Sequence, residues 1–161
     1  MIRLLTGNVI SADETNIILE VHGVGYLVSC PVTTAGLQPG TAVTLHTYLA
    51  VRETALDLYG FATTEELRMF EVLLGVPKVG PKSALQILNQ ASPSLLVEAA
   101  QKNDATYLQK ISGIGKKTCE NVTQYLSGKL DALPETDQAA HQLSSTQADA
   151  IDALVSLAYD S

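Results

Sequence analysis

Two segments of the sequence, LLGVPKVGPKSAL (residues 73–85) and LQKISGIGKKTCE (residues 108–120), decide how the middle of this chain folds. They align at one constant offset, and each combines an apolar residue, a glycine-containing turn and a lysine. The matched pairs are Val76 with Ile111, Val79 with Ile114, Gly80 with Gly115, and Lys82 with Lys117. An internal repeat of this kind predicts one structural unit that occurs twice.

The repeated pattern is typical of a helix-hairpin-helix motif, in which a tight turn joins two short helices. The first backbone N–H groups of the second helix have no partner within that helix, and they lie at the positive end of its dipole. Glycine allows a ligand to approach this backbone closely, and the neighbouring lysine adds a positive charge. The motif therefore suits a phosphate of a nucleic-acid backbone, which it can bind without reading a base.

Two other interpretations of the turn fit the residues less well. A nucleotide-binding phosphate loop requires G-x-x-x-x-G-K-[ST], whereas Lys117 here follows Lys116 at the position that needs serine or threonine. A tight helix connection without a ligand would explain a single Gly-Ile-Gly turn. It does not explain why a lysine follows the turn in both copies.

Before the repeat, short runs rich in Val, Ile, Leu, Thr and Tyr are separated by Gly, Pro, Asn and Asp. The runs are IRLLTGNVI, NIILEVHG, GYLVSCP, AVTLHTYLAV and ALDLYGF. In TLHTYLAV, Leu45, Thr47 and Leu49 fall on one face of a strand, and His46 and Tyr48 fall on the other. Five such strands favour a small closed barrel of the oligonucleotide-binding type.

The periodicity changes at Thr63, where a helical segment begins. Thr63 and Glu66 have the spacing of a capping box. Apolar residues then recur at helical spacing at Leu67, Phe70, Leu73 and Leu74. Ser92 before Pro93 predicts a second helix start, and Asp104 can cap a third.

The formal net charge of −7 is distributed unevenly along the 161 residues. Residues 1–62 carry two basic and five acidic side chains, and residues 63–130 carry eight basic and six acidic ones. Residues 131–161 carry six acidic side chains and no basic one. The positive charge therefore coincides with the glycine turns, which favours an anionic ligand at that part of the chain.

The remaining composition favours a globular protein, since 46% of the residues are hydrophobic and 17% are charged. The first residues lack the pattern of a secretory signal, and no apolar run reaches spanning length, so we expect a cytoplasmic protein without a membrane partner. Cys30 and Cys119 lie far apart without a C-x-x-C spacing, and the three histidines share no ligand pattern with them. We therefore expect buried free thiols, and neither a metal ion nor another cofactor.

The chain resembles the RuvA family of bacterial proteins, which recognise the Holliday junction. The resemblance runs from residue 1 to about residue 130, and it returns weakly over residues 148–159. It rests on VHGVGY (residues 21–26), on YLAVRETALDLYGFAT (residues 48–63), and on the two hairpins with their spacing. Together and in this order, these features are highly specific.

The resemblance implies a multidomain α+β fold in four parts. Residues 1–62 would form a five-stranded OB-type β-barrel, and residues 63–130 an all-α domain with two helix-hairpin-helix motifs. Residues 131–146 would form a flexible acidic linker, and residues 147–161 the start of a RuvB-binding helical domain that is incomplete. The apolar stripe of this last segment is Ile151, Leu154, Val155 and Ala158.

The resemblance also implies a function without a catalytic centre. The chain would bind four-way junction DNA as a homotetramer, and two tetramers can enclose one junction. The junction would be held open and nearly square, regardless of its sequence, for branch migration in homologous recombination and DNA repair. The RuvB ATPase would drive migration, and the RuvC resolvase would act on the same junction.

The family motif carries over to particular residues of this chain. The expected DNA-binding residues are Lys78, Val79, Gly80, Lys82 and Ser83 in the first hairpin, and Gly113, Ile114, Gly115, Lys116 and Lys117 in the second. Glu53 matches the acidic pin of the family, which lies at the tetramer centre where DNA strands exchange. A carboxylate there repels phosphates and disfavours a continuous duplex across the centre.

Three features depart from the family pattern. Lys78 stands where glycine is usual, so the first turn either takes another shape or holds Lys78 in a left-handed conformation at a cost of about 1–2 kcal/mol. Thr54 replaces the second acid of the pin, which halves its charge unless Asp57 compensates. The chain ends after one predicted helix of the C-terminal domain, from which we expect poor coupling to RuvB.

Two functions of other classes remain open. A base-excision glycosylase would need a catalytic aspartate downstream of its hairpin, and Asp131 and Asp137 are available, but they lie in the polar stretch LDALPETDQAAHQLSSTQ. A general duplex- or single-strand-binding module would lack a preference for junctions. A stacking platform for single strands is disfavoured, because aromatic residues make up 5% of the chain and tryptophan is absent.

Overall fold

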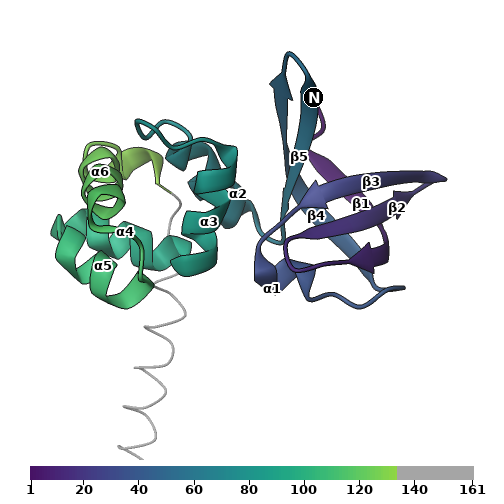
Figure 1. Ribbon diagram of the computed structural model, residues 1–161, viewed down its shortest axis with the longest axis horizontal. Helices are drawn as coiled ribbons and strands as arrows, with labels where there is room; N and C mark the ends of the chain where they lie inside the picture. Colours follow the sequence, from purple (N-terminus) through teal and green to yellow (C-terminus); the bar gives the residue numbers. More distant parts are fainter. Residues whose placement is uncertain (134–161) are drawn as a thin grey trace, which may run out of the picture.

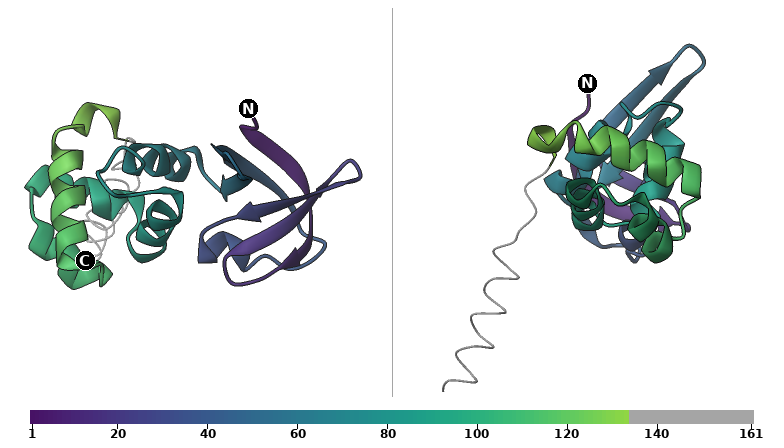
Figure 2. Two further views of the ribbon diagram at one scale, coloured as in Figure 1. Left: turned by 45° about the horizontal axis from the view of Figure 1, so that its top comes forward. Right: turned by 90° about the vertical axis from the view of Figure 1, so that its left-hand side faces the viewer.

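The computed structural model describes residues 1–133 as a β-barrel followed by a group of short helices (Figure 1). The predicted C-terminal segment at residues 147–161, with its apolar stripe, lies outside the described residues, as does all but the start of the predicted linker. The barrel and the helices lie side by side, and α2 (Thr64–Leu73) is placed between them (Figures 1 and 2).

The N-terminal barrel has the five strands that the sequence predicts. They are β1 (Leu4–Ala12), β2 (Asn16–Val21), β3 (Val24–Ser29), β4 (Ala42–Arg52) and β5 (Ala55–Phe61). The strands close in the order β1-β2-β3-β5-β4, through antiparallel pairs and one parallel pair between β3 and β5. A short helix, α1 (Val32–Ala35), connects β3 to β4. The predicted barrel class is confirmed, because closure leaves no free sheet edge among these strands.

Strand β4 is buried on both faces, which its alternating sequence does not reveal. Leu45 and Thr47 are fully buried on the face that lines the barrel. Ala50 is buried on the opposite face, where Tyr48 packs with it against the helical core. The helices that follow therefore cover part of the face that alternation would assign to solvent, around Tyr48 and Ala50, whereas Ala42 and Thr44 on the same face remain exposed.

A cluster of aromatic rings joins the barrel to the helices. Phe70 of α2 is fully buried, and its ring lies 5.5 Å from Tyr48, 5.2 Å from Tyr59 and 4.9 Å from Phe61, measured between centroids. The tilted and edge-on arrangements are those that aromatic quadrupoles favour. One hydrophobic core thus continues from β4 and β5 into the helices, and it fixes where the helices stand relative to the barrel.

The helical part contains α2, α3 (Pro81–Gln90), α4 (Pro93–Lys102), α5 (Ala105–Ser112), α6 (Lys116–Ser127) and the 3-10 turn η1 (Leu130–Ala132). The three caps predicted from the sequence are present. Thr63 and Glu66 form a complete capping box at α2, Ser92 accepts from the Leu95 amide at α4, and Asp104 accepts from the Tyr107 amide at α5. The local cap chemistry therefore sets these helix starts.

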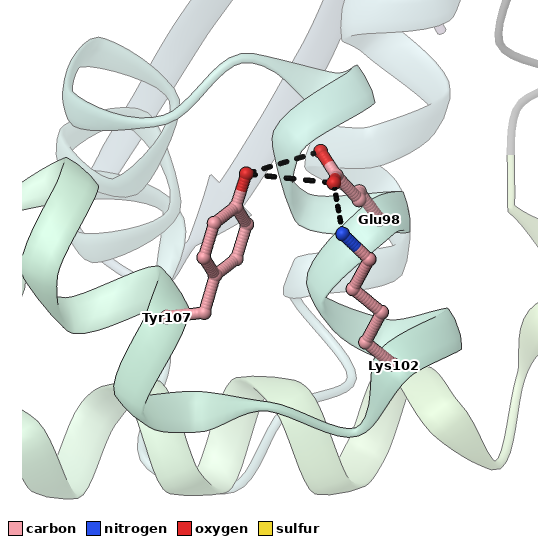
Figure 3. Close-up of polar contacts among 3 residues, drawn as sticks. All are labelled: Glu98, Lys102 and Tyr107. Carbon is pink, nitrogen blue, oxygen red and sulfur yellow. Dashed lines mark hydrogen bonds and ion pairs between the residues drawn. The ribbon is translucent and has the colours of Figure 1, made fainter.

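A polar cluster on the surface joins α4 to α5 (Figure 3). Glu98 accepts hydrogen bonds from Lys102 and, at 3.4 Å, from the Tyr107 hydroxyl, and the Lys102 ammonium lies 5.0 Å from the centre of the Tyr107 ring. The hydrogen bond from Lys102 is the main reason that the pKa of the Glu98 carboxyl is lowered. All three side chains have partners within the cluster, which fits a structural role between the two helices.

Candidate nucleic-acid interface

The two predicted hairpins share one backbone conformation at their turns. Lys78 and Gly113, which are equivalent in the repeat, have φ angles of +67° and +72°. Both lie in the left-handed region that favours glycine. The structure therefore selects one of the two alternatives for Lys78, because the turn keeps its shape and the lysine takes the left-handed conformation.

The helices that follow the two turns begin without a side-chain cap. Gly80 is the N-cap of α3 and Gly115 is the N-cap of α6, and neither helix start receives a hydrogen bond from a capping side chain. The starts of α2, α4 and α5 each have one. Only at the two hairpins, among these five helices, are the first backbone N–H groups left for another partner.

The space around both glycines is open. A Cβ atom placed on Gly80 or on Gly115 would find no atom of residues 1–133 within 4 Å, apart from those of its chain neighbours. Neither residue needs a positive φ, since Gly80 has φ −94° and Gly115 has φ −59°. The absence of side chains here is therefore not required by packing or by backbone conformation. It leaves the helix start accessible to a ligand as large as a phosphate.

The lysines of both hairpins are exposed and surround these helix starts. Within residues 1–133, Lys78, Lys82 and Lys117 form no ion pair, and Lys116 lies 4.0 Å from Glu120 in the next turn of α6. Ser83 is also exposed, in the first turn of α3. The two turns thus present amide groups together with cations, of which only Lys116 has a carboxylate partner within residues 1–133, and this combination binds phosphate oxygens.

Apolar residues anchor the two turns to different extents. Ile114 is 5% exposed, and its counterpart Val79 is half-buried against the same core. Val76 is buried, but its counterpart Ile111 is 54% exposed, so the alignment of these two residues does not extend to their packing. The structure therefore repeats the turn itself more faithfully than the helix before it.

Helix α6 connects the two hairpins. It begins at the second hairpin, and its Tyr125 lies against Gly75 at the beginning of the first, where an added Cβ would come within 2.1 Å of the Tyr125 hydroxyl oxygen. A cleft of about 280 Å³ next to this contact is lined by Pro77 and by Asn121, Gln124 and Tyr125 of α6. The relative position of the two hairpins is thus fixed by packing, and not only by the chain between them.

Glu53 lies at the tip of the β4–β5 hairpin, which stands out from the barrel at the top of Figure 1. Its side chain is exposed, and it forms no ion pair with any residue between 1 and 133. Asp57 does not add its charge to that of Glu53, because it is paired with Arg52 across the same hairpin. The tip therefore presents one unpaired carboxylate.

A cleft of about 220 Å³ separates this hairpin from the start of α3. Its barrel side is formed by Arg52, Asp57 and Tyr59, and its helical side by residues 80–83. Burial is the main reason that the pKa of the Tyr59 hydroxyl is raised, so this hydroxyl remains protonated at neutral pH. The structure thus places Arg52 and Asp57 of the β4–β5 hairpin and the start of α3 on either side of a shared cleft.

Arg52 lines this cleft, although the sequence-based prediction did not include it among the candidate residues. It lies in the barrel, far from the glycine turns in the sequence, and no local motif marks it. A weak signal was present, since Arg3 and Arg52 are the only basic residues in residues 1–62. Arg3 is paired with Glu71 of α2 and does not line the cleft. Arg52 is therefore the arginine of the barrel that lines the cleft.

The remaining candidates from the sequence do not form a reactive site. Cys30 and Cys119 are buried free thiols, and burial raises the pKa of Cys30 to about 12 and also raises that of Cys119. Asp131 is exposed in η1, and Asp137 lies outside the described residues. In residues 1–133 no group of three or more His, Cys, Asp or Glu side chains could hold a metal ion. No helix in this part of the chain is long and apolar enough to cross a membrane.

The fold and the paired hairpins define a class of protein, namely a small closed barrel joined to a tandem of helix-hairpin-helix motifs. Comparison with known families agrees with this class. Residues 1–60 match the family described as RuvA N terminal domain, and residues 70–127 match the SAM-like helix-hairpin-helix tandem.

Curated relatives match almost the whole chain. A protein of Clavibacter sepedonicus is 42% identical over 161 residues, which cover 99% of this chain and 75% of the relative. Proteins of Trichlorobacter lovleyi and Acinetobacter baumannii are 41% and 40% identical over 167 residues, covering 99% of this chain and 84% of each relative. All three are named Holliday junction branch migration complex subunit RuvA. The chain belongs to the RuvA family.

Proposed function

We propose that this chain binds four-way DNA junctions through their phosphates and holds them open for branch migration in recombination and repair. The observation that carries the proposal is the pair of equivalent helix starts at Gly80 and Gly115, which are uncapped, open and surrounded by lysines. Contacts of this kind position a duplex without reading its sequence. A protein that holds a migrating junction needs this property, because the junction moves through many sequences. The names of the relatives support the choice of a Holliday junction as the substrate.

Within this proposal, each carried-over residue has a physical role. The Val79 and Ile114 amides already donate hydrogen bonds, to the Val76 carbonyl and to Ser112 Oγ. The amides at Gly80 and in the first turn of α3 bind one duplex-arm phosphate, with Lys78, Val79, Lys82 and Ser83 beside it. The amides that follow Ile114 and Gly115 bind another, with Gly113, Lys116 and Lys117 beside it. The single carboxylate of Glu53 repels the phosphates of a duplex that would run unbroken past the tip of the β4–β5 hairpin.

The assembly that we propose is a non-catalytic homotetramer, in which four copies place four pairs of hairpins under the four arms. One or two tetramers bind a junction. Translocation then requires an external motor, the RuvB ATPase, and cleavage requires a separate nuclease, RuvC. The chain itself supplies binding, geometry and electrostatic repulsion.

The test is the size and preference of the complex with a synthetic four-way junction of fixed sequence. We expect a protein unit of four chains, or of eight, and tighter binding to the junction than to linear duplex of the same length. Binding should fall steeply with salt, by about 0.9 in the logarithmic slope for each phosphate contacted, and equally for junctions of unrelated sequence. Equal affinity for linear duplex would instead support a general duplex-binding module, and base release from damaged DNA would support a glycosylase.

A further inference from the structure

The Arg52–Asp57 ion pair lies at the cleft that the barrel shares with the first hairpin. Arg52 pairs with Ala55 in the ladder of β4 and β5, and Asp57 pairs with Ala50, so Arg52 and Asp57 are diagonal neighbours on one face of the hairpin. The two side chains remain partly accessible, at 59% and 32% of their full exposure. The pair is therefore in contact with water and can be broken without unfolding the barrel.

The opposite wall of this cleft is the start of α3, with Gly80, Lys82 and Ser83. A second cleft, of about 380 Å³, shares Asp57, Tyr59 and Lys82 with the first. Asp57 thus pairs with the cation of the barrel and lines both clefts together with Lys82 of the first hairpin. A phosphate bound at the start of α3 would compete with Asp57 for the guanidinium of Arg52, because both are oxygen anions that a guanidinium binds in the same way.

We propose that Asp57 is an intramolecular competitor of the DNA phosphate at the first hairpin, because it holds Arg52 in an ion pair that the bound phosphate has to replace. This inference rests on the proposed function of the hairpins. It makes Asp57 a positioning residue that lowers the affinity of the first hairpin, and it makes Arg52 a phosphate-binding residue supplied by the barrel. At the second hairpin the ion pair lies within one helix, where Lys116 is 4.0 Å from Glu120, and no carboxylate of another element in residues 1–133 pairs with its lysines.

The expected magnitude follows from the strength of an exposed ion pair. Such a pair shifts the equilibrium between paired and unpaired Arg52 in the free protein by roughly twofold to fivefold. Breaking it should therefore strengthen junction binding by about that factor. Removing any acid near the DNA also strengthens binding, because it removes long-range repulsion between that carboxylate and the DNA phosphates. The specific effect therefore has to be separated from the general one by comparing backgrounds with and without Arg52.

The experiment is a double-mutant cycle with Asp57→Asn and Arg52→Gln, measured on the full chain with a synthetic four-way junction at several salt concentrations. We expect Asp57→Asn to tighten binding about twofold to fivefold more when Arg52 is present than in the Arg52→Gln background. The slope of the logarithmic salt dependence should be the same in Asp57→Asn as in the unaltered chain, because Arg52 contacts the phosphate in both, and shallower by about 0.9 in Arg52→Gln, which loses that contact. Glu14→Gln, which removes an exposed acid of the barrel elsewhere, serves as the matched charge control.

An equal gain from Asp57→Asn in both backgrounds would overturn the inference, because Asp57 would then act through the general field alone. The inference would also be overturned if Asp57→Asn tightened binding to linear duplex alone and had no effect in a Glu53→Gln background. Arg52, once freed from Asp57, would then act by neutralising Glu53. Failure of the unaltered chain to bind junctions would reject the proposed function and this inference together. If the unaltered chain binds junctions but the effects of Asp57→Asn and Arg52→Gln simply add, the inference alone is rejected. Thermal unfolding of each variant verifies that the fold is retained.

Discussion

Lys78 and Gly113 occupy the same left-handed position in the two turns, but Gly113 takes this conformation without a steric penalty. The lysine bears a conformational cost of about 1–2 kcal/mol and brings a positive charge to the hairpin. In the proposed function, Lys78 favours DNA binding at the expense of stability, so one residue of the first turn acts on both properties.

Replacing Lys78 with glycine should separate these two effects. We expect Lys78→Gly to increase the free energy of unfolding by about 1 kcal/mol and to weaken junction binding, because it relieves strain and removes a cation. The reciprocal change Gly113→Ala should lower stability by about 1–2 kcal/mol. Denaturant unfolding and junction titration measure the two properties. Loss of stability in Lys78→Gly would mean that the lysine side chain is held by contacts that offset its backbone strain.

Gly115→Val tests whether the open helix start binds DNA. Any residue can adopt the backbone conformation of Gly115, and a Cβ there would find no atom of residues 1–133 within 4 Å apart from its chain neighbours. The fold should therefore be retained. We expect junction affinity to fall by about tenfold or more, corresponding to at least ~1.4 kcal/mol, because the side chain blocks close approach of a phosphate. Gly36→Val, at the exposed end of α1 in the barrel, is the control. Unchanged affinity in a folded Gly115→Val tetramer would remove the second hairpin from the DNA surface.

The helices and strands differ in what sets their positions. Helices α2, α4 and α5 begin where Thr63, Ser92 and Asp104 supply a cap, so their starts depend on local chemistry. The strands of the barrel depend on distant partners, and β1 pairs with both β2 and β4. A substitution in β1 that prevents one of these pairs should therefore affect the whole barrel.

Gly7 of β1 is the position where this dependence can be measured. A Cβ on Gly7 would lie 2.0 Å from the backbone oxygen of Glu20 in β2, and a backbone atom in a closed barrel cannot move away cheaply. We expect Gly7→Ala to destabilise the protein by about 3 kcal/mol or more, measured by denaturant unfolding. Gly25→Ala in β3 is the matched control, because its Cβ would make an ordinary contact of 3.5 Å with Ile18. Similar stability of the two variants would show that β1 and β2 separate more easily than the closed barrel implies.

The charge of the whole molecule opposes DNA binding, although its hairpins favour it. The net charge is −7, and the positive residues are concentrated in residues 63–130. Glu53 adds a single unpaired carboxylate at the projecting tip of the barrel, since Asp57 is paired with Arg52. Attraction at the hairpins and repulsion at the tip together would favour a DNA whose arms separate at the centre over one that continues through it.

Glu53→Gln should therefore change the preference between DNA shapes more than the overall affinity. We expect affinity for linear duplex to rise more than affinity for the four-way junction, because the variant no longer repels a duplex at the centre. Competition between the two DNAs for one protein sample gives the ratio directly. Glu14→Gln should raise both affinities slightly and leave the ratio unchanged. An unchanged ratio in Glu53→Gln would reduce Glu53 to a general electrostatic contribution.

Much of this molecule follows from short stretches of its sequence. Alternation and turn residues place the five strands, cap residues place three helix starts, and the repeat of Gly80 and Gly115 locates both hairpins. Each of these signals is contained within about ten residues, because turns, caps and helical periodicity are local interactions. The sequence could therefore predict the fold class and the residues of the two hairpins.

Other properties depend on residues that are distant in the sequence. The conformation of Lys78 was open between two alternatives, Val76 and Ile111 look equivalent but differ in burial, and Arg52 carries no motif. The burial of Val76 depends on how the helices pack together, and the place of Arg52 beside α3 depends on how the helices lie against β4 and β5; such packing depends on shape across the whole core. Tertiary structure alone therefore decided that Asp57 holds Arg52 beside the first hairpin, whereas the sequence left open whether Asp57 compensates for the missing acid of the tip.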